Sequence, residues 1–162
     1  MEFAGQITLL FHFIGMGLLV AVQVAGFVVG KQYKKAQNLQ TKATLLKVMR
    51  PIGLLSPIAV VIMIVSGIGN MHTFQIALAD FSWLQIKIVI FAIAAILGIV
   101  MGIISKKRSS LVDVMLQGKV PPEAEANLKK YDGLMQVFSI ITPILLLAIL
   151  CLSVYGRLGG QQ

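Results

Sequence analysis

Four long apolar runs constrain this chain more than any other feature of its sequence. Each run is at least as long as the roughly 20 residues that a helix needs to cross the hydrocarbon of a bilayer. They cover residues 3–30, 51–71, 82–104 and 134–155. Backbone groups in lipid must be hydrogen-bonded within the protein, and four segments are too few to close a β-barrel. The sequence therefore predicts an all-α fold, an integral membrane four-helix bundle.

Composition supports this fold class and limits the number of domains. The chain has 162 residues, of which 57% are apolar and 12% are charged, whereas a soluble domain has about 45–50% apolar and about 25% charged residues. Four spans would use nearly all the apolar residues. We therefore expect residues 1–162 to form a single transmembrane domain with short connections.

The basic residues predict the orientation of this domain. Of the 14 lysines and arginines, 12 fall in the two connections, 31–50 and 105–133: Lys31, Lys34, Lys35, Lys42, Lys47, Arg50, Lys106, Lys107, Arg108, Lys119, Lys129 and Lys130. By the positive-inside rule these connections are cytoplasmic loops. Both termini would then lie on the outer (periplasmic) side, in a multi-pass protein of the inner (plasma) membrane.

The same excess of positive charge limits the choice of partners. It is explained by the topogenic signal and by attraction to anionic lipid headgroups. The lipid bilayer is therefore the expected partner, and no nucleic acid partner is expected.

Turn-forming residues predict the structure of the second connection. Ser110–Gln117 has the pattern of a short amphipathic helix on the membrane surface, and Gly118 is its expected stop. Pro121-Pro122-Glu123 then begins a helix that runs into the fourth span. Pro57 and Pro143 predict local bends within the second and fourth spans.

Two ionisable side chains fall inside the apolar runs, and such residues suggest function because they are costly in lipid. They are His12 in the first span and Lys87 in the third. At 1.5 Å per residue, His12 lies about 10 Å and Lys87 about 7–8 Å from the outer ends of their spans. We expect both side chains at similar depth in the outer leaflet.

Helical spacing predicts which way each of these residues points. One face of the first span carries His12, Met16, Leu19, Gln23 and Gly26, and one face of the third carries Lys87, Phe91, Ala94 and Gly98. The small residues on these faces are typical of helix contacts in membranes. His12 and Lys87 are therefore expected to face the bundle interior. Gly26-x-x-x-Gly30 and Gly98-x-x-x-Gly102 predict close helix crossings, more readily within this chain than in a dimer.

His72 follows the second span, and three interpretations of this region remain open from the residues alone. Haem iron takes axial ligands such as His and Met from opposed helices, which His12 could supply with His72 or Met16. Copper favours imidazole with soft donors, and His12 and His72 lie in the outward half with Met16, Met71 and Cys151. Alternatively, His12 hydrogen-bonds a neighbouring helix while Lys87 extends to the membrane surface. No common catalytic motif is present, so enzymatic activity is undecided.

Several short motifs carry a family resemblance. These are Phe11-His12 in the first span, Arg50 before the second, Ser66-Gly67 near its end, and Trp83-Leu84-Gln85-Ile86-Lys87 opening the third. With the topology, they resemble a loose group of small four-helix membrane proteins that includes the CopD-type copper-resistance domain and the HemJ-type protoporphyrinogen oxidases. The HemJ-like resemblance implies b-type haem, with His12 and Lys87 functionally important. A CopD-like resemblance implies copper handling.

These observations lead to one main hypothesis and two alternatives. The main hypothesis is a redox-linked membrane protein in which His12 ligates a b-type haem near the outer face and Lys87 pairs with a propionate or a substrate carboxylate. The first alternative is a cofactor-free accessory or structural subunit that docks onto other subunits of a larger membrane complex. The second is a copper-handling membrane protein.

Overall fold

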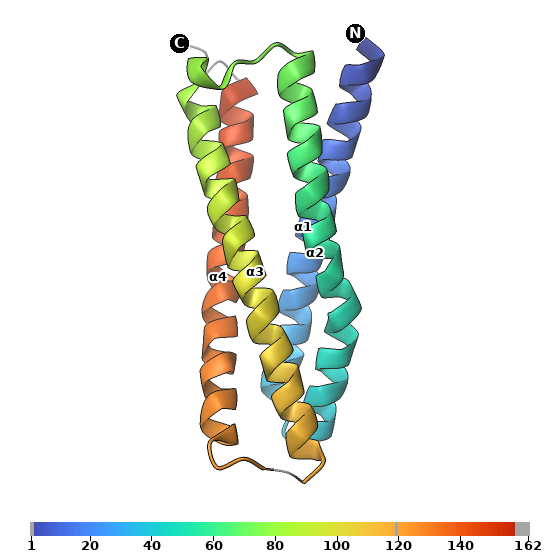
Figure 1. Cartoon of the computed structure of the whole chain (residues 1–162), viewed down its shortest axis with the longest axis vertical. Coiled ribbons are helices and arrows are strands. Elements are labelled where there is room, and N and C mark those ends of the chain that lie inside the picture. The colour runs from blue at the N-terminus through green and yellow to red at the C-terminus, as the bar shows by residue number, and fades with distance from the viewer. Residues whose placement is uncertain (1, 119, 158–162) are drawn as a thin grey trace.

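The computed structural model describes residues 2–118 and 120–157, and these form four long helices (Figure 1). In chain order they are α1 (Glu2–Lys35), α2 (Leu39–Thr73), α3 (Ser82–Leu116) and α4 (Ala124–Arg157), with a short 3₁₀ turn, η1 (Leu78–Asp80), before α3. Each long helix contains a segment apolar and long enough to cross a membrane. The expectation of an all-α chain with four candidate spans is confirmed, and its architecture is that of a multi-pass membrane protein.

The helices are longer than the spans expected from sequence. They contain 34 or 35 residues, which corresponds to about 51 Å at 1.5 Å per residue. The hydrocarbon of a bilayer is only about 30 Å thick. A helix of this length that crossed a bilayer upright would extend roughly 20 Å beyond the hydrocarbon.

Most of the segments expected to be loops are helical continuations of the spans. The first connection shortens to residues 36–38, where the Asn38 side chain caps α2 by accepting from the Thr41 N–H at 2.7 Å. The separate helix expected over Ser110–Gln117 was wrong, because this segment is the last part of α3. Gly118 follows with a φ of 75°, in the left-handed region that glycine adopts without steric cost. Its assignment as a stop is confirmed, as is the continuous α4 after the two prolines.

The four helices form two antiparallel hairpins. α1 packs mainly against α2, and α3 mainly against α4, with a smaller contact between α2 and α3 and the smallest between α1 and α4. We call α1–α2 the first hairpin and α3–α4 the second. Both hairpin turns lie at the end that carries the basic connections, called here the basic end. The first residues of α1 and the last residues of α4 lie at the opposite end, called here the terminal end (Figure 1).

The main buried apolar cluster lies at the basic end. All four helices contribute to it, through Tyr33, Ala43, Leu46, Val112 and Leu128. Elsewhere the bundle has many exposed large apolar side chains, such as Leu54, Ile99 and Leu147. Side chains of this kind suit a surface that faces lipid rather than water.

Candidate functional site

His12 lies on α1 and is hydrogen-bonded to α2. Its ring is half-buried, and Nδ1 lies 3.0 Å from Oγ of Ser66. A Cβ at Gly67 would lie 3.8 Å from His12 Cε1, so the imidazole lies directly against this turn of α2. A bond from His12 to a neighbouring helix, one of the interpretations left open by the sequence, is therefore present.

The contacts of Ser66 favour one of the two tautomers of His12. Only 3% of Ser66 is exposed, and its Oγ also lies 2.6 Å from the carbonyl oxygen of Ile62. A hydroxyl has a single proton to donate, and the shorter contact assigns that proton to Ile62. Oγ of Ser66 then accepts from Nδ1–H of His12. The resulting tautomer carries its ring lone pair on Nε2.

Small residues fix the register that brings His12 to Ser66. A Cβ at Gly69 would lie 2.8 Å from Cγ2 of Thr8, and one at Gly15 would lie 3.0 Å from Cγ of Met63 and 3.3 Å from the Ala59 carbonyl oxygen. A side chain at either glycine would require these neighbours to shift. Gly15 is thus a packing contact between α1 and α2.

Lys87 lies on α3 and therefore belongs to the second hairpin. It is half-buried, as are Phe91, Ala94 and Gly98 on the same face, whereas Ile86 is exposed. One turn earlier, the Trp83 indole lies against Gly156 of α4, where an added Cβ would overlap the ring. The predicted stripe is thus the more buried side of this part of α3. His12 and Lys87 come from different hairpins, both in the half nearer the terminal end.

The other predicted site residues lie farther along the helices. His72 is exposed and stands six residues beyond Ser66 on α2, or about 9 Å along the helix axis. It lines a shallow surface hollow with Ile68 and Met71. Met16 is half-buried one turn from His12 on α1, about 6 Å away along the axis. The register therefore separates both residues from the level of His12.

The described residues contain no group of three or more His, Cys, Asp or Glu side chains that could hold a metal ion. Cys151, one of the soft donors considered for copper, is exposed on α4. A metal at His12 would therefore not be held by a cluster of three or more such side chains among the described residues.

The structure reveals a polar contact between α1 and α4. Thr142 is 5% exposed, and its Oγ1 lies 3.2 Å from Oε1 of Gln23 and 2.7 Å from the Phe138 carbonyl oxygen. Gln23 is on the predicted face of α1 that includes His12. That face contacts α2 at His12 and α4 at Gln23, so the expectation that it points into the bundle is confirmed.

A second polar cluster, at the basic end, was missed from sequence. Nε of Arg108 lies 3.1 Å from Oδ1 of Asp132, and the Arg108 guanidinium carbon lies 3.9 Å from the centre of the Tyr33 ring. The three residues come from α3, α4 and α1. Arg108 stands in a run of three basic residues that resembles a simple topogenic signal. Only its burial, at 7% exposure, distinguishes it from Lys106 and Lys107.

The predicted glycine contacts are only partly realised. A Cβ at Gly26 would lie 3.9 Å from Cε of Met49, but one at Gly30, Gly98 or Gly102 would meet nothing within 4 Å. The internal crossing expected at Gly98-x-x-x-Gly102 was therefore wrong. Gly98 is half-buried and Gly102 is exposed, so no described helix approaches this pair closely enough for a backbone crossing.

No family model, curated protein or solved structure matches this chain. The assignment of function therefore rests on the chemistry of its own residues. Among these, His12 lies within hydrogen-bond distance of a buried hydroxyl on the neighbouring helix, and imidazoles that ligate a metal also commonly bond a fixed group through their second ring nitrogen.

Proposed function

We propose that this protein is a small redox-linked membrane protein in which His12 ligates a b-type haem through Nε2. A bound haem would supply one-electron transfer. His12 would hold the iron, and Ser66 would hold His12. The resemblance to HemJ-like proteins supports the same two residues, His12 and Lys87, as functional.

The observation that carries this proposal is the hydrogen bond from Nδ1–H of His12 to Ser66. Because Ser66 donates to Ile62 at 2.6 Å, it can only accept from His12. The imidazole is thereby held in one tautomer and one orientation, with its lone pair on Nε2. Outer-shell bonds of this kind also raise the basicity of a ligating imidazole.

Lys87 has a complementary role in this proposal. Its ammonium is a compact positive charge on a flexible stem, and it is half-buried on the second hairpin. A haem propionate or a substrate carboxylate carries the opposite charge and would pair with this ammonium. Lys87 therefore orients an acidic group, while His12 provides the ligand.

The distribution of charge supports a location for the site. The basic end would face the cytoplasm by the positive-inside rule, so the termini would lie on the periplasmic side of the inner membrane. His12 and Lys87 would then stand in the outer leaflet. The electron partner would approach from that side or from within the bilayer.

An optical spectrum of detergent-purified protein, expressed with an adequate haem supply, tests the proposal. We expect a Soret band that is lost in His12→Ala and retained in His72→Ala, the matched histidine control. Ser66→Ala should weaken haem affinity by about 10- to 100-fold, as is typical of outer-shell substitutions. Lys87→Gln should retain the band and weaken binding of a haem with free propionates more than that of its dimethyl ester.

Two results would end the haem proposal. One is a wild-type protein without a Soret band under these conditions, and the other is a band that His12→Ala leaves unchanged. Metal analysis of the same preparations separates copper from haem, because copper bound through His12 would remain after dialysis without any Soret band.

A cofactor-free accessory subunit is the second candidate, and the open face of α3 favours it. Gly98 and Gly102 lie one turn apart with nothing within 4 Å of an added Cβ, so another helix could approach there closely. In that case a defined partner should copurify with the chain. Assembly should be normal in a His12→Ala/Lys87→Ala double variant and impaired in Gly98→Leu/Gly102→Leu.

A further inference from the structure

The two hairpins are joined most firmly at the basic end. There Tyr33 of the first hairpin lies against Arg108 of the second, with 3.9 Å between the guanidinium carbon and the ring centre. Arg108 also pairs with Asp132 on α4 at 3.1 Å. We call Tyr33, Arg108 and Asp132, together with the buried apolar cluster around them, the basic-end joint.

The apolar part of this joint also crosses between the hairpins. Tyr33, Ala43 and Leu46 from the first hairpin pack with Val112 and Leu128 from the second. Val112 is fully buried, at 0% exposure. The joint therefore resembles the core of a small soluble four-helix protein.

Close approaches at the terminal end have a different pattern. Gly5 lies against Phe74, Gly69 against Thr8 and Gly156 against Trp83. The first two contacts lie within the first hairpin and the third within the second. Each of these close approaches thus joins helices of the same hairpin.

The arrangement of the helices in Figure 1 agrees with this division into two hairpins. In Figure 1 the pair α1 and α2 and the pair α3 and α4 stand apart at the terminal end, while α3 crosses toward α2 as it approaches the basic end. The connection between the hairpins at the terminal end, residues 74–81, includes only the short turn η1 and is otherwise irregular. Such a connection tolerates a change in the distance between α2 and α3 more readily than a rigid helix would.

The two ends also differ in the force that holds the helices together. The basic end carries most of the charge of the chain, so it must lie outside the hydrocarbon. In water, burial of apolar side chains drives association. Inside lipid this drive is absent, and association depends on packing and polar contacts.

We propose that the chain is a hinge in which the basic-end joint holds the two hairpins together and the terminal ends of the hairpins part and close in the membrane. Gln23 and Thr142, 3.2 Å apart between α1 and α4, mark the boundary of the joined region. Because His12 and Lys87 are on different hairpins, this motion changes their separation. The hinge itself does not depend on haem binding.

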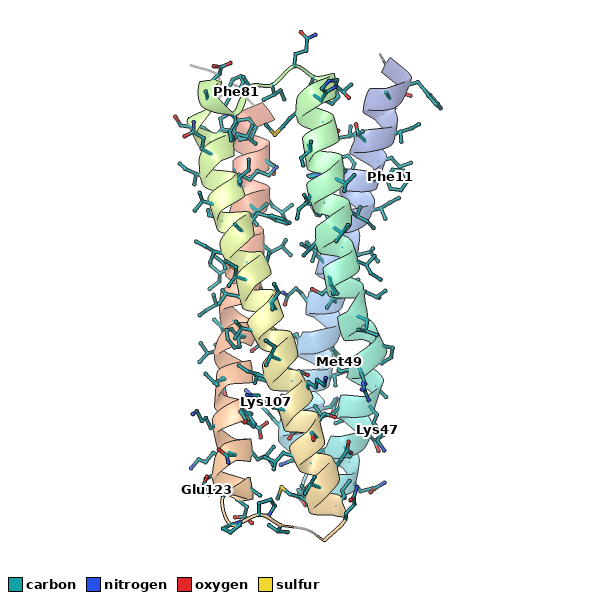
Figure 2. All side chains as sticks on the ribbon, viewed as in Figure 1. Phe11, Lys47, Met49, Phe81, Lys107 and Glu123 are labelled. Carbon is teal, nitrogen blue, oxygen red and sulfur yellow. The ribbon has the colours of Figure 1, made fainter. Side chains whose placement is uncertain are left out.

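Distances between paired spin labels in lipid nanodiscs test the hinge. In a Cys151→Ser background, Ile68→Cys on α2 and Ile86→Cys on α3 report on the terminal end. Lys47→Cys on α2 and Lys107→Cys on α3 report on the basic end, where both lysines lie (Figure 2). All four side chains are exposed. We expect a narrow distance distribution for the basic-end pair and a broad or double-peaked distribution for the terminal pair.

Substitutions in the joint supply the second measurement. Arg108→Gln should broaden the basic-end distribution, whereas Lys106→Gln, an exposed neighbour of the same charge, should leave it unchanged. If Arg108→Gln loses its helical circular dichroism, Asp132→Asn provides a milder variant of the same pair.

Equal widths for the two wild-type pairs would overturn the hinge. So would a folded Arg108→Gln, or a folded Asp132→Asn in its place, that leaves the basic-end distribution unchanged. These distances are measured without haem, so a missing Soret band would refute the proposed function and leave the hinge standing.

Discussion

Leu128 and Leu147 lie on the same helix, yet their environments differ completely. At the basic end, Leu128 is 8% exposed and packs among residues of all four helices, whereas Leu147, nearer the terminal end, is 61% exposed. The first environment suits a surface hidden from water and the second a surface that faces lipid tails. The comparison separates a small apolar core, of the kind that burial from water stabilises, from a part of the bundle whose exposed apolar surface suits lipid.

The largest effect should come from breaking the charged part of the basic-end joint. Arg108→Ala leaves Asp132 without its cation and Tyr33 without the stacked guanidinium. Removing one partner of a buried pair costs about 3–5 kcal/mol. Because a third of the Asp132 side chain is exposed and can be rehydrated, we expect a loss of about 3 kcal/mol. Unfolding in mixed micelles, followed by circular dichroism, measures it.

Lys107→Ala is the matched control for Arg108→Ala. Lys107 is the adjacent residue in the sequence and is exposed. Its loss should change the free energy of unfolding by less than about 0.5 kcal/mol. If Lys107→Ala and Arg108→Ala cost the same, the basic run acts only through its net charge, and the joint is not a structural unit.

The next effect should separate the two environments on α4 directly. Leu128→Ala should lower the free energy of unfolding by about 2 kcal/mol, at the lower end of the range for truncation in a core. Leu147→Ala should change it by less than about 0.5 kcal/mol, since lipid replaces the lost contacts. Comparable losses, measured by the same unfolding method, would contradict the division of the bundle into a core and a lipid-facing part.

A smaller change in the free energy of unfolding should distinguish a glycine with close neighbours, Gly15, from one without them, Gly102. A methyl group at Gly15 would press on Met63 and the Ala59 carbonyl oxygen, so Gly15→Ala should destabilise by about 1–3 kcal/mol. A methyl group at Gly102 would meet nothing within 4 Å. Gly102→Ala should instead stabilise by about 0.4–1 kcal/mol, because alanine restricts the unfolded chain. Destabilisation by Gly102→Ala would indicate that a partner helix occupies this face.

The smallest effect should come from the polar contact between α1 and α4. Thr142→Val removes the hydroxyl that contacts Gln23, and single interhelical hydrogen bonds in membranes average about 0.6 kcal/mol. Ser153→Ala, whose hydroxyl bonds to Ile149 on the same helix, provides a control without an interhelical contact. If Thr142→Val lowered the free energy of unfolding as much as Arg108→Ala does, the two regions would not differ in how strongly they stabilise the bundle.

Particular residues show how far the sequence alone could reach. Ser82 was expected to begin the third span and Gly118 to end a helix, and both do so. The extensions of α1 to Lys35 and of α2 back to Leu39 were missed. The charged residues there were interpreted as loop, although a helix outside the hydrocarbon tolerates charge on its exposed side.

The candidate site was predicted only in part for a related reason. Helical periodicity placed His12 and Gln23 on one face of α1, and both have partners on other helices. Periodicity along one helix carries no information about the register of the next. That His12 meets Ser66, and does not lie at the level of His72, depends on the register of α1 against α2, where Gly15 and Gly69 pack closely.

The sequence by itself determined that the chain has four apolar helices, where their apolar faces lie, and which end carries the charge. These properties follow from residue type and from the geometry of a single helix. Tertiary structure decided that Arg108, and not Lys106 or Lys107, is buried between the hairpins, and that Ser66 holds His12. Burial and hydrogen-bond partnership depend on which residues of different helices come to the same level, and that register is set by the packing of small side chains between helices.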